Sequence, residues 1–355
     1  MGLYTGVFRT VRITDRTLPE VLGGNGGLER RDILDLLSML KGLGTAWLEI
    51  GPEVLKITGA LPEGIEYLYR IEREQDLKSL SSSDFKKVIL GMELPGSMEL
   101  PLSPALRSKA VTLECRAETM EDLTGLKNRL RCAGLPGNVR MIRLLGLNGL
   151  IGPAWLEKAE EIKRTLDVKL DLCPENLYYS ATAIAIDGMR QVVDHVTASF
   201  AGHGGPSGYA ALEQVLTFIE TLADPYAGME LGALPRLAAW FSEHTGVRIP
   251  ENMPVIGPDI FRYESGIHAD GILKDPATYE PFDPAVVGQC RRLSIGKHSG
   301  RKSVLYKLRE LGIEAGETQT AELLERIRGK SILLHRDLRD DEILDLLHVR
   351  TAAAV

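Results

Sequence analysis

The chain has 355 residues, and its 42 Lys and Arg against 49 Asp and Glu give a formal net charge of −7. Binding of nucleic-acid phosphates needs an excess of positive charge, so the composition argues against a nucleic-acid-binding protein. No apolar run is long enough to span a membrane, and the first residues lack the apolar core of a signal peptide. We therefore expect a cytoplasmic protein of two domains, or one large barrel with an appendage, at roughly 150 residues per domain.

Short apolar runs and segments of helical period alternate along the first 200 residues. Eight such units in succession predict a parallel (β/α)8 barrel of the TIM type, with a doubly wound sheet as the alternative. In a barrel, functional side chains are expected directly after each strand. The predicted strands are 11–18, 46–51, 66–72, 87–93, 110–118, 139–146, 168–173 and 195–202, and the clearest helices are 29–44, 119–134 and 152–167.

The pattern changes after residue 202. Segments 209–223 and 235–245 have helical period and close the barrel, which gives a first domain over 1–248. Residues 249–260 contain three prolines and are predicted to be a linker. Residues 261–355 form a smaller, mostly α-helical C-terminal region.

Several features suggest sites but fit no established motif. The glycines of 23–27 lack the Lys-Ser/Thr of a P-loop, so we expect a flexible loop. Segment 291–309 holds seven Lys or Arg, which favours a solvated helix face and leaves an anion or CoA-phosphate site open. All seven histidines lie from residue 195 onward without metal-ligand spacing, so a metal site before it would need carboxylates alone. The four cysteines are scattered, and no disulfide framework is expected.

Two motifs in the last hundred residues are highly specific. They are ESGIHADGILKDPATYEPFDP from Glu264 and LSIGKHSGR over 293–301. Together with TDRTL at 14–18 and GYAALEQV at 208–215, they resemble homocitrate synthase of the nitrogenase-associated kind and, more broadly, 2-isopropylmalate and citramalate synthases. The resemblance implies a (β/α)8 barrel with small C-terminal subdomains.

The same resemblance implies an acyltransferase that performs a Claisen condensation. A 2-oxo acid is held on a divalent metal at the barrel mouth, acetyl-CoA loses a methyl proton, the enolate attacks the ketone, and the thioester is hydrolysed. This chemistry needs a Lewis acid, an arginine beside the developing oxyanion and a base near the acetyl methyl group.

The barrel departs from the family at these positions. The family's first-strand motif, Asp-Thr-Thr-Leu-Arg-Asp/Glu, becomes Asp15-Arg16-Thr17-Leu18-Pro19-Glu20, which loses the catalytic arginine and keeps a vestigial metal ligand position at Glu20. Since one carboxylate cannot hold a catalytic metal, we expect none in this barrel. The other departures are Gly146-Leu147 for Asp-Thr, Leu172 and Pro174 for the two histidines of His-x-His, and 201–206 for Asn-Gly-Leu-Gly-Glu-Arg.

The small C-terminal region keeps its motif. In the family this region reaches the neighbouring subunit and places a His and a Tyr over its metal-bound substrate, and these positions are His268 and Tyr279 here. Glu264 and Ser265 are predicted to bind substrate. Tyr263 stands where the family usually has a histidine, and His298 is assigned a structural role.

The combination predicts one subunit of a split, two-gene homocitrate synthase, of the kind known in some anaerobic nitrogen fixers. A homologous partner with an intact barrel would hold Mg²⁺ or Mn²⁺, this chain would donate His268 and Tyr279 in trans, and acetyl-CoA and a 2-oxo acid would meet at the interface. The small region favours 2-oxoglutarate, although the residues that select the 2-oxo acid are expected mostly in the partner's barrel.

Three alternatives stand beside this hypothesis. A non-catalytic regulatory or scaffold paralogue would bind a synthase without donating residues. A self-sufficient acyltransferase would use different site residues. A repurposed barrel would bind another ligand altogether.

Overall fold

A computed structural model describes most of the chain, which divides into two compact units, 1–249 and 250–355. Each unit is described by itself. The described residues are 11–24, 27–73, 75–81, 84–91, 106–117, 120, 122–132, 137–147, 154–223 and 227–348.

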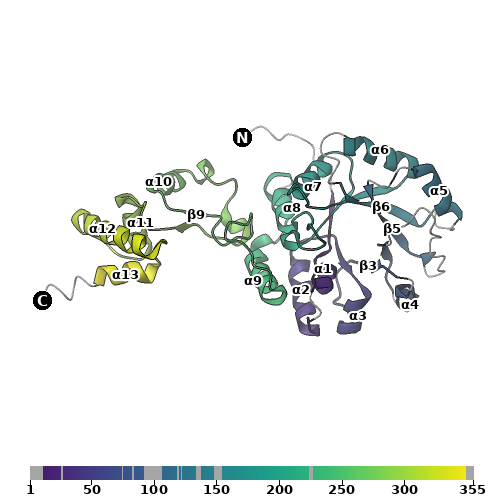
Figure 1. Cartoon of the computed structure of the whole chain (residues 1–355), viewed down its shortest axis with the longest axis horizontal. Helices are drawn as coiled ribbons and strands as arrows, with labels where there is room; N and C mark the ends of the chain where they lie inside the picture. The colour runs from purple at the N-terminus through teal and green to yellow at the C-terminus, as the bar shows by residue number, and fades with distance from the viewer. Residues whose placement is uncertain are drawn as a thin grey trace. The chain divides into compact units, whose positions relative to one another are not determined.

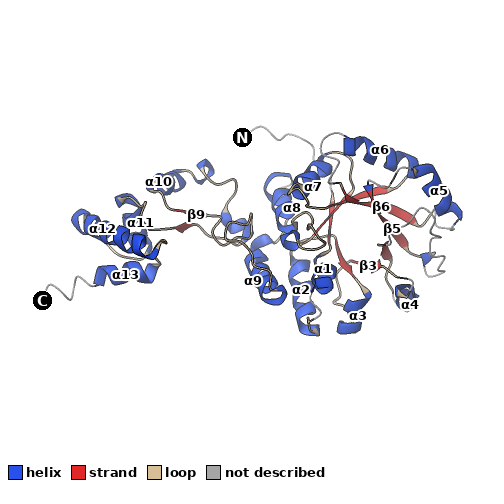
Figure 2. Ribbon diagram, in the orientation of Figure 1, coloured by secondary structure: helices blue, strands red, loops and turns tan. Residues whose placement is uncertain are grey.

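The first unit is a closed barrel of parallel strands ringed by helices (Figures 1 and 2). Within the described residues the order is β1 to β8 in sequence, and β8 closes the barrel on β1 through partners such as Thr197 and Thr14. The predicted (β/α)8 barrel is confirmed. The strands are β1 (Arg12–Asp15), β2 (Trp47–Ile50), β3 (Tyr67–Ile71), β4 (Lys87–Leu90), β5 (Ala110–Arg116), β6 (Val139–Gly146), β7 (Lys169–Pro174) and β8 (His195–Ala198).

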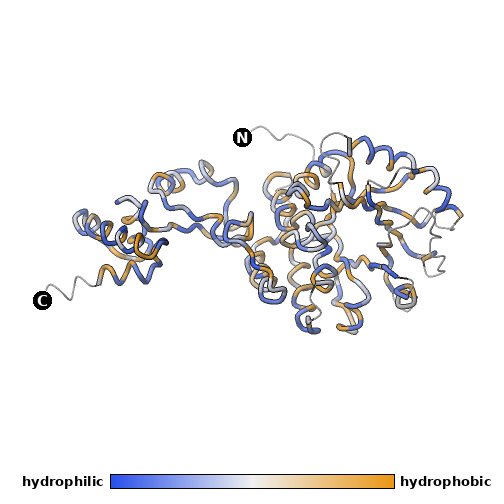
Figure 3. Tube along the Cα trace, in the orientation of Figure 1, coloured by the Kyte–Doolittle hydropathy of each residue, from blue (hydrophilic) through white to orange (hydrophobic). Residues whose placement is uncertain are grey.

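The helices of this unit bury one apolar face each. In α2 the buried residues recur at helical spacing, and they include Ile33, Leu36, Leu37 and Leu40. Figure 3 shows hydrophobic and hydrophilic residues alternating along the chain trace. The helices are α1 (Thr17–Gly24), α2 (Arg30–Gly42), α3 (Pro52–Thr58), α4 (Asp76–Ser81), α5 (Leu123–Cys132), α6 (Ala154–Leu166), α7 (Ala181–Arg190), α8 (Leu212–Phe218) and α9 (Leu234–Thr245).

The first and last strands end earlier than the sequence pattern predicts. The first strand was predicted to reach residue 18, but β1 ends at Asp15. Oδ1 of Asp15 accepts hydrogen bonds from the amide (2.7 Å) and the hydroxyl of Thr17, and these bonds start α1. The eighth was predicted to reach residue 202, but a short 3-10 turn, Phe200–Gly202, follows β8. The predicted loop at 23–27 is also corrected in part, since Gly23 and Gly24 end α1, while residues 25 and 26 lie outside the described residues.

The second unit is mostly α-helical, as predicted. β9 (Arg262–Tyr263) pairs in parallel with β10 (Arg292–Leu293), and α10 (Gly266–Lys274), α11 (Arg301–Glu310), α12 (Glu317–Leu334) and α13 (Asp340–His348) complete it. Residues 249–260 form turns. None of the helices described in either unit has the length and hydropathy needed to cross a membrane. The core of the second unit includes Ala269, Leu293, Ile295, Val304, Leu308, Leu323, Leu324, Ile327, Leu338 and Ile343.

Two buried carboxyl groups hold the turn that follows β8. Asp15 accepts a hydrogen bond from the hydroxyl of Thr17, and the oxygen of that hydroxyl accepts one from the amide of Phe200 (2.8 Å). Glu213 Oε2 accepts a hydrogen bond from the amide of Ala201 (2.9 Å). The other carboxyl oxygen of each acid is buried without a partner in the described residues. Burial raises the pKa of Asp15 and of Glu213 to about 7.

We expect these two acids to make the barrel less stable as the pH rises. Their pKa values in the folded state exceed their unfolded values, so the folded state holds more protons between about pH 4 and 7, and the free energy of unfolding falls across that window. Asp15→Asn with Glu213→Gln should flatten the dependence and unfold at higher urea than the wild type at pH 8. Urea unfolding followed by circular dichroism at pH 5.5 and pH 8 measures this. The exposed Asp35→Asn change serves as the control, and an unchanged slope in the double variant would contradict the assignment.

Candidate active site

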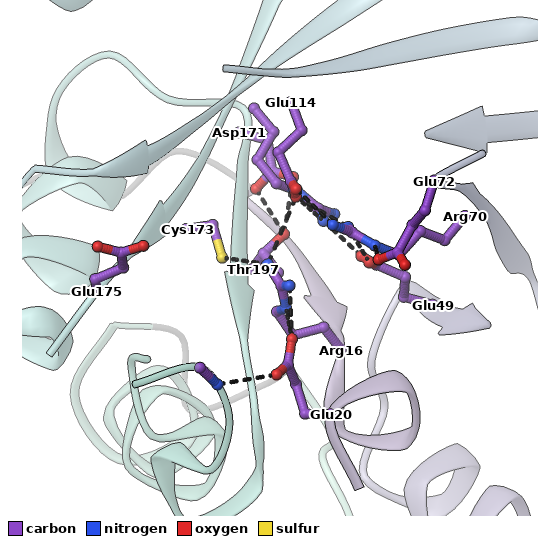
Figure 4. Close-up of polar contacts among 12 residues, drawn as sticks. Arg16, Glu20, Glu49, Arg70, Glu72, Glu114, Asp171, Cys173, Glu175 and Thr197 are labelled. Carbon is purple, nitrogen blue, oxygen red and sulfur yellow. Dashed lines mark hydrogen bonds and ion pairs between the residues drawn. The ribbon is translucent and has the colours of Figure 1, made fainter. Parts of the chain in front are cut away.

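Five buried charged side chains on the barrel strands form what we call the charged layer: Glu49, Arg70, Glu114, Arg143 and Asp171. Figure 4 shows Glu49, Arg70, Glu114 and Asp171 among its labelled residues. Arg143 Nε donates to Asp171 Oδ2 (2.7 Å), and its Nη1 contacts Glu49 and lies 3.3 Å from Glu114. Arg70 donates to Glu49 (2.8 Å) and Glu114 (2.6 Å). Every member is therefore paired with an opposite charge.

Strand register builds this layer. Glu114 and Asp171 are the Cα partners of Arg143 on its two neighbouring strands, β5 and β7. Burial alone would raise the pKa of Glu49 and Glu114, but the neighbouring guanidinium groups lower both below their ordinary values. Glu49 and Glu114 therefore stay ionised. Thr197 of β8 donates its hydroxyl to Asp171 (2.8 Å), which satisfies that carboxylate further.

The charged layer was not predicted from the sequence, although a signal was present. Each member stands inside a predicted apolar strand, as in AWLEIG, YLYRIE and VKLDLC. A charge within such a run points either outward to the surrounding helices or into the barrel. The strand pattern alone does not decide between the two, since a barrel strand alternates its faces.

Arg16 lies at the end of β1 and draws together residues from distant parts of the chain (Figure 4). Its Nη2 lies 2.6 Å from Glu20, its Nη1 donates to Cys173 Sγ (3.2 Å) and lies 3.5 Å from Glu114, and its guanidinium sits over the ring of Tyr209, 4.3 Å from the centroid. Burial raises the pKa of Cys173 to about 12, so the sulfur that accepts this hydrogen bond is a neutral thiol.

Both oxygens of Glu20, the vestigial ligand position, are engaged. Oε1 accepts from Arg16, and Oε2 accepts from the amide of Gly205 (3.1 Å) in the loop after β8. A Cβ at Gly204 would lie 2.4 Å from Glu20 Oε2, so a glycine, with its positive φ of 125°, is needed for this close approach. Glu20 therefore ties α1 to the loop that replaces the family's Asn-Gly-Leu-Gly-Glu-Arg.

The residues at this barrel mouth do not fit a divalent metal. Leu172 and Pro174 offer no ligand atom on their side chains, and Gly146 and Leu147 offer none after β6. Across the described ranges, no three His, Cys, Asp or Glu side chains are grouped so that they could hold a metal ion. The strongest positive charge beside Glu20 is the guanidinium of Arg16.

The second unit brings His268 and Tyr279 together. His268 is exposed on α10, and its ring centroid lies 4.6 Å from that of Tyr279, which is 45% exposed. A Cβ at Gly271 would come within 2.4 Å of Tyr279 Cε2, so the tyrosine ring packs directly on the backbone of α10. The nearby Ile267 is 76% exposed.

The residues predicted to bind substrate lie at the start of the same helix. Ser265 caps α10, with its side chain accepting from the amide of Ile267 (3.2 Å). Glu264 Oε1 accepts from the amide of His298 (3.1 Å), which braces α10 against the loop before α11. Tyr263 packs on the core of the unit. Substrate binding by Glu264 and Ser265 stays a prediction.

Removing Arg143 should strongly destabilise the barrel. Arg143→Met leaves Glu49 and Asp171 buried with one partner fewer, and breaking a buried ion pair in this way costs about 3–5 kcal/mol. Urea unfolding of the barrel transition measures the loss. Arg31→Met is the matched control, because the Arg31 guanidinium is 89% exposed and lies 3.8 Å from Asp35, and we expect a change below about 1 kcal/mol there. Equal effects in the two variants would show that the charged layer does not stabilise the fold.

Comparison with known proteins links both units to one family. Residues 255–331 match the family model "Homocitrate synthase post-HMGL domain-like". A homocitrate synthase omega subunit from Clostridium pasteurianum is 30% identical over 94% of this chain and 94% of its own. Homocitrate synthase 1 of Nostoc sp. is 35% identical over 54% and 50%, and 2-isopropylmalate synthase 2 of Caldanaerobacter subterraneus subsp. tengcongensis is 31% identical over 66% and 62%.

Among solved structures, hydroxymethylglutaryl-CoA lyase from Pseudomonas aeruginosa shares the barrel fold, with a TM-score of 0.52, 15% identity and coverage of 68% of this chain and 94% of that one. At this identity the likeness concerns the fold alone. The match to the omega subunit, by contrast, extends along nearly all of both sequences. The chain belongs to the homocitrate synthase family.

Proposed function

We propose that this chain is the subunit of a homocitrate synthase-type acyltransferase that donates His268 and Tyr279 in trans to the barrel of a homologous partner. The observation that carries the proposal is the exposed His268–Tyr279 ring pair of the second unit, in a chain whose own Glu20 is paired with Arg16. The similarity to a protein named as an omega subunit supports a second subunit.

The chemistry of the pair suits formation and quenching of an enolate. A histidine exchanges protons at neutral pH, so the exposed imidazole can take a methyl proton from acetyl-CoA. The resulting carbanion forms a C–C bond with the carbonyl carbon of 2-oxoglutarate, and the oxyanion takes up a proton. Water then cleaves the thioester, which releases CoA and homocitrate. The packing of Tyr279 on α10 fixes the ring beside His268. A divalent metal held in the partner's barrel would polarise the ketone.

We also propose that this chain's barrel holds no catalytic metal. Arg16 supports this, because its guanidinium already neutralises the carboxylate of Glu20 and contacts Cys173, the residue between the two family histidine positions. A cation entering here would face the fixed positive charge of Arg16 at 2.6 Å from the same oxygen. The barrel's remaining role in the proposal is to support the subunit and its interface.

We expect turnover only when the two subunits are combined. Acetyl-CoA-dependent release of CoA with 2-oxoglutarate and Mn²⁺ should be absent for this chain alone and present after co-expression with a His-x-His homologue from the same genome. His268→Ala in this chain should lower kcat of the pair by about 10²–10⁴-fold, as expected for loss of a general base. The control is His298→Ala, since only the backbone of His298 is bonded to Glu264. A pair that is unaffected by His268→Ala would favour the scaffold alternative, and turnover by the chain alone would favour the self-sufficient one.

Gly271→Ala should impair the same reaction without disturbing assembly. The added methyl group would displace the ring of Tyr279, and misplacement by about 1 Å at a reacting centre costs on the order of 10²-fold in rate. Steady-state kinetics and size-exclusion chromatography of the pair separate rate from assembly. Gly329→Ala in α12 is the matched control, because no atom lies within 4 Å of the added Cβ. Full activity in Gly271→Ala would exclude a catalytic role for the position of Tyr279.

Manganese binding tests the barrel directly. We expect electron paramagnetic resonance titration to find no bound Mn²⁺ on this chain at concentrations that saturate a His-x-His homologue measured alongside. The physical reason is the fixed guanidinium charge at Glu20 and the missing ligand atoms at Leu172 and Pro174. Stoichiometric Mn²⁺ on the isolated chain would overturn this part of the proposal.

A further inference from the structure

A cavity of about 330 Å³ opens in the second unit, and neither His268, Tyr279, Glu264 nor Ser265 lines it. Its walls come from β9, from the loop after β10 and from the end of α12. Four nitrogen-bearing side chains line it: Arg262, Lys297, His335 and Arg336. A cavity of this size is at the small end of the range for ligand pockets, and it is larger than a single phosphate group needs.

Two of the four side chains are already paired. Arg262 binds Asp259 (2.7 Å) and also contacts Asp337, and Arg336 makes a forked pair with Glu342 at 2.6 and 2.8 Å. These ion pairs fix the two arginines at the wall of the cavity. A ligand carboxylate would have to compete with Asp259, Asp337 and Glu342 for their N–H groups.

Lys297 and His335 differ from the arginines. Both are exposed, and in the part of the chain that the structure describes neither side chain has a hydrogen bond or ion pair. Their backbones, by contrast, are held. The amide of Lys297 donates to Ser331 Oγ (3.2 Å), and Ser331 Oγ donates to the carbonyl of Arg336 (2.8 Å). The two side chains are therefore presented from a braced frame.

The frame depends on close backbone approach and on the cap of α12. A Cβ at Gly296 would lie 2.1 Å from Asp337 Oδ1, so a side chain there would displace that carboxylate. His335 has φ 52°, in the left-handed region, and forms the C-cap of α12, where its amide donates to the carbonyl of Ile332. A left-handed residue commonly ends a helix, and histidine adopts this conformation more often than most residues. The cap thus fixes where the side chain of His335 leaves the helix.

We infer that this cavity binds a phosphate-bearing small molecule. The free ammonium of Lys297 and the imidazole of His335 supply donors to the phosphate oxygens, and the hydroxyl of Ser331 links the backbones of Lys297 and Arg336 behind them. The side chain of Ile332, which is 58% exposed and lines the same cavity, offers an apolar surface to the organic part of the ligand. A dianionic phosphate monoester matches two unpaired nitrogen donors better than a monoanion does. The phosphate could be carried by CoA or be a free phosphate.

Isothermal titration of the full chain tests the inference, with inorganic phosphate, adenosine 3′,5′-bisphosphate and citrate as probes. The bisphosphate represents the phosphorylated end of CoA. We expect both phosphate probes to bind, and Lys297→Met and His335→Asn each to weaken binding about tenfold or more. Asparagine tolerates the left-handed backbone at 335, and Lys302→Met, an exposed lysine of α11 outside the cavity, is the matched control.

The outcomes separate the sources of the phosphate. Tighter binding of the bisphosphate than of inorganic phosphate would support a CoA-type ligand, and equal binding would support free phosphate. No binding of either phosphate, binding unaffected by the Lys297 and His335 variants, or citrate binding more tightly than both would overturn the inference. Thermal unfolding of each variant confirms that the unit is folded. Because this readout is binding to the isolated chain, it is independent of the proposed synthase activity.

Discussion

Pairing of buried charge is the constraint on which the first unit depends. Eight short strands enclose an interior that is apolar at one level, with Trp47, Leu68, Ile89 and Met141, and charged at the next. A charge taken out of water is tolerated only when opposite charges and hydrogen bonds surround it. The charged layer meets this condition by drawing one member from each of five strands, β2, β3, β5, β6 and β7. Register, closure of the barrel and the ionisation state of its carboxylates are thus linked.

Arg16 extends the same principle to the mouth of the barrel. The carboxylate of Glu20 on α1 would be costly without an opposite charge in this largely buried setting. Arg16, between β1 and α1, provides that charge, and Cys173 and Tyr209 lie beside its guanidinium. Under the proposal that this barrel holds no catalytic metal, Arg16 neutralises Glu20 in place of a cation. Under the proposed function, this division leaves the reactive groups to the second unit.

In the second unit, hydrogen bonds and packing hold the backbone that carries the exposed side chains. The cap at Ser265, the bond from His298 to Glu264 and the contact of Tyr279 with Gly271 fix α10, while the exposed face carries His268. The cavity at the end of α12 is built in the same way, with a braced backbone and free side chains. Under the two proposals, both arrangements would lower the entropy cost of binding, because the backbone that carries the side chains is ordered before the ligand arrives.

The sequence by itself determined the barrel and the family. Alternating apolar runs and helical periods act locally, so the strands were predictable to within a few residues, and the ESGIHADG and GKHSG motifs identified the relationship because they are contiguous. The residues at the vestigial ligand positions could also be listed from sequence. The side-chain contacts that Arg16 and Arg143 make could not be predicted from sequence. Arg16 and Cys173 are 157 positions apart, and Arg143 reaches carboxylates on three other strands. Only the closed barrel decided these pairs. The partner of a buried charge is set by distance in space, and the order of residues along the chain does not give that distance until the register of the strands is known.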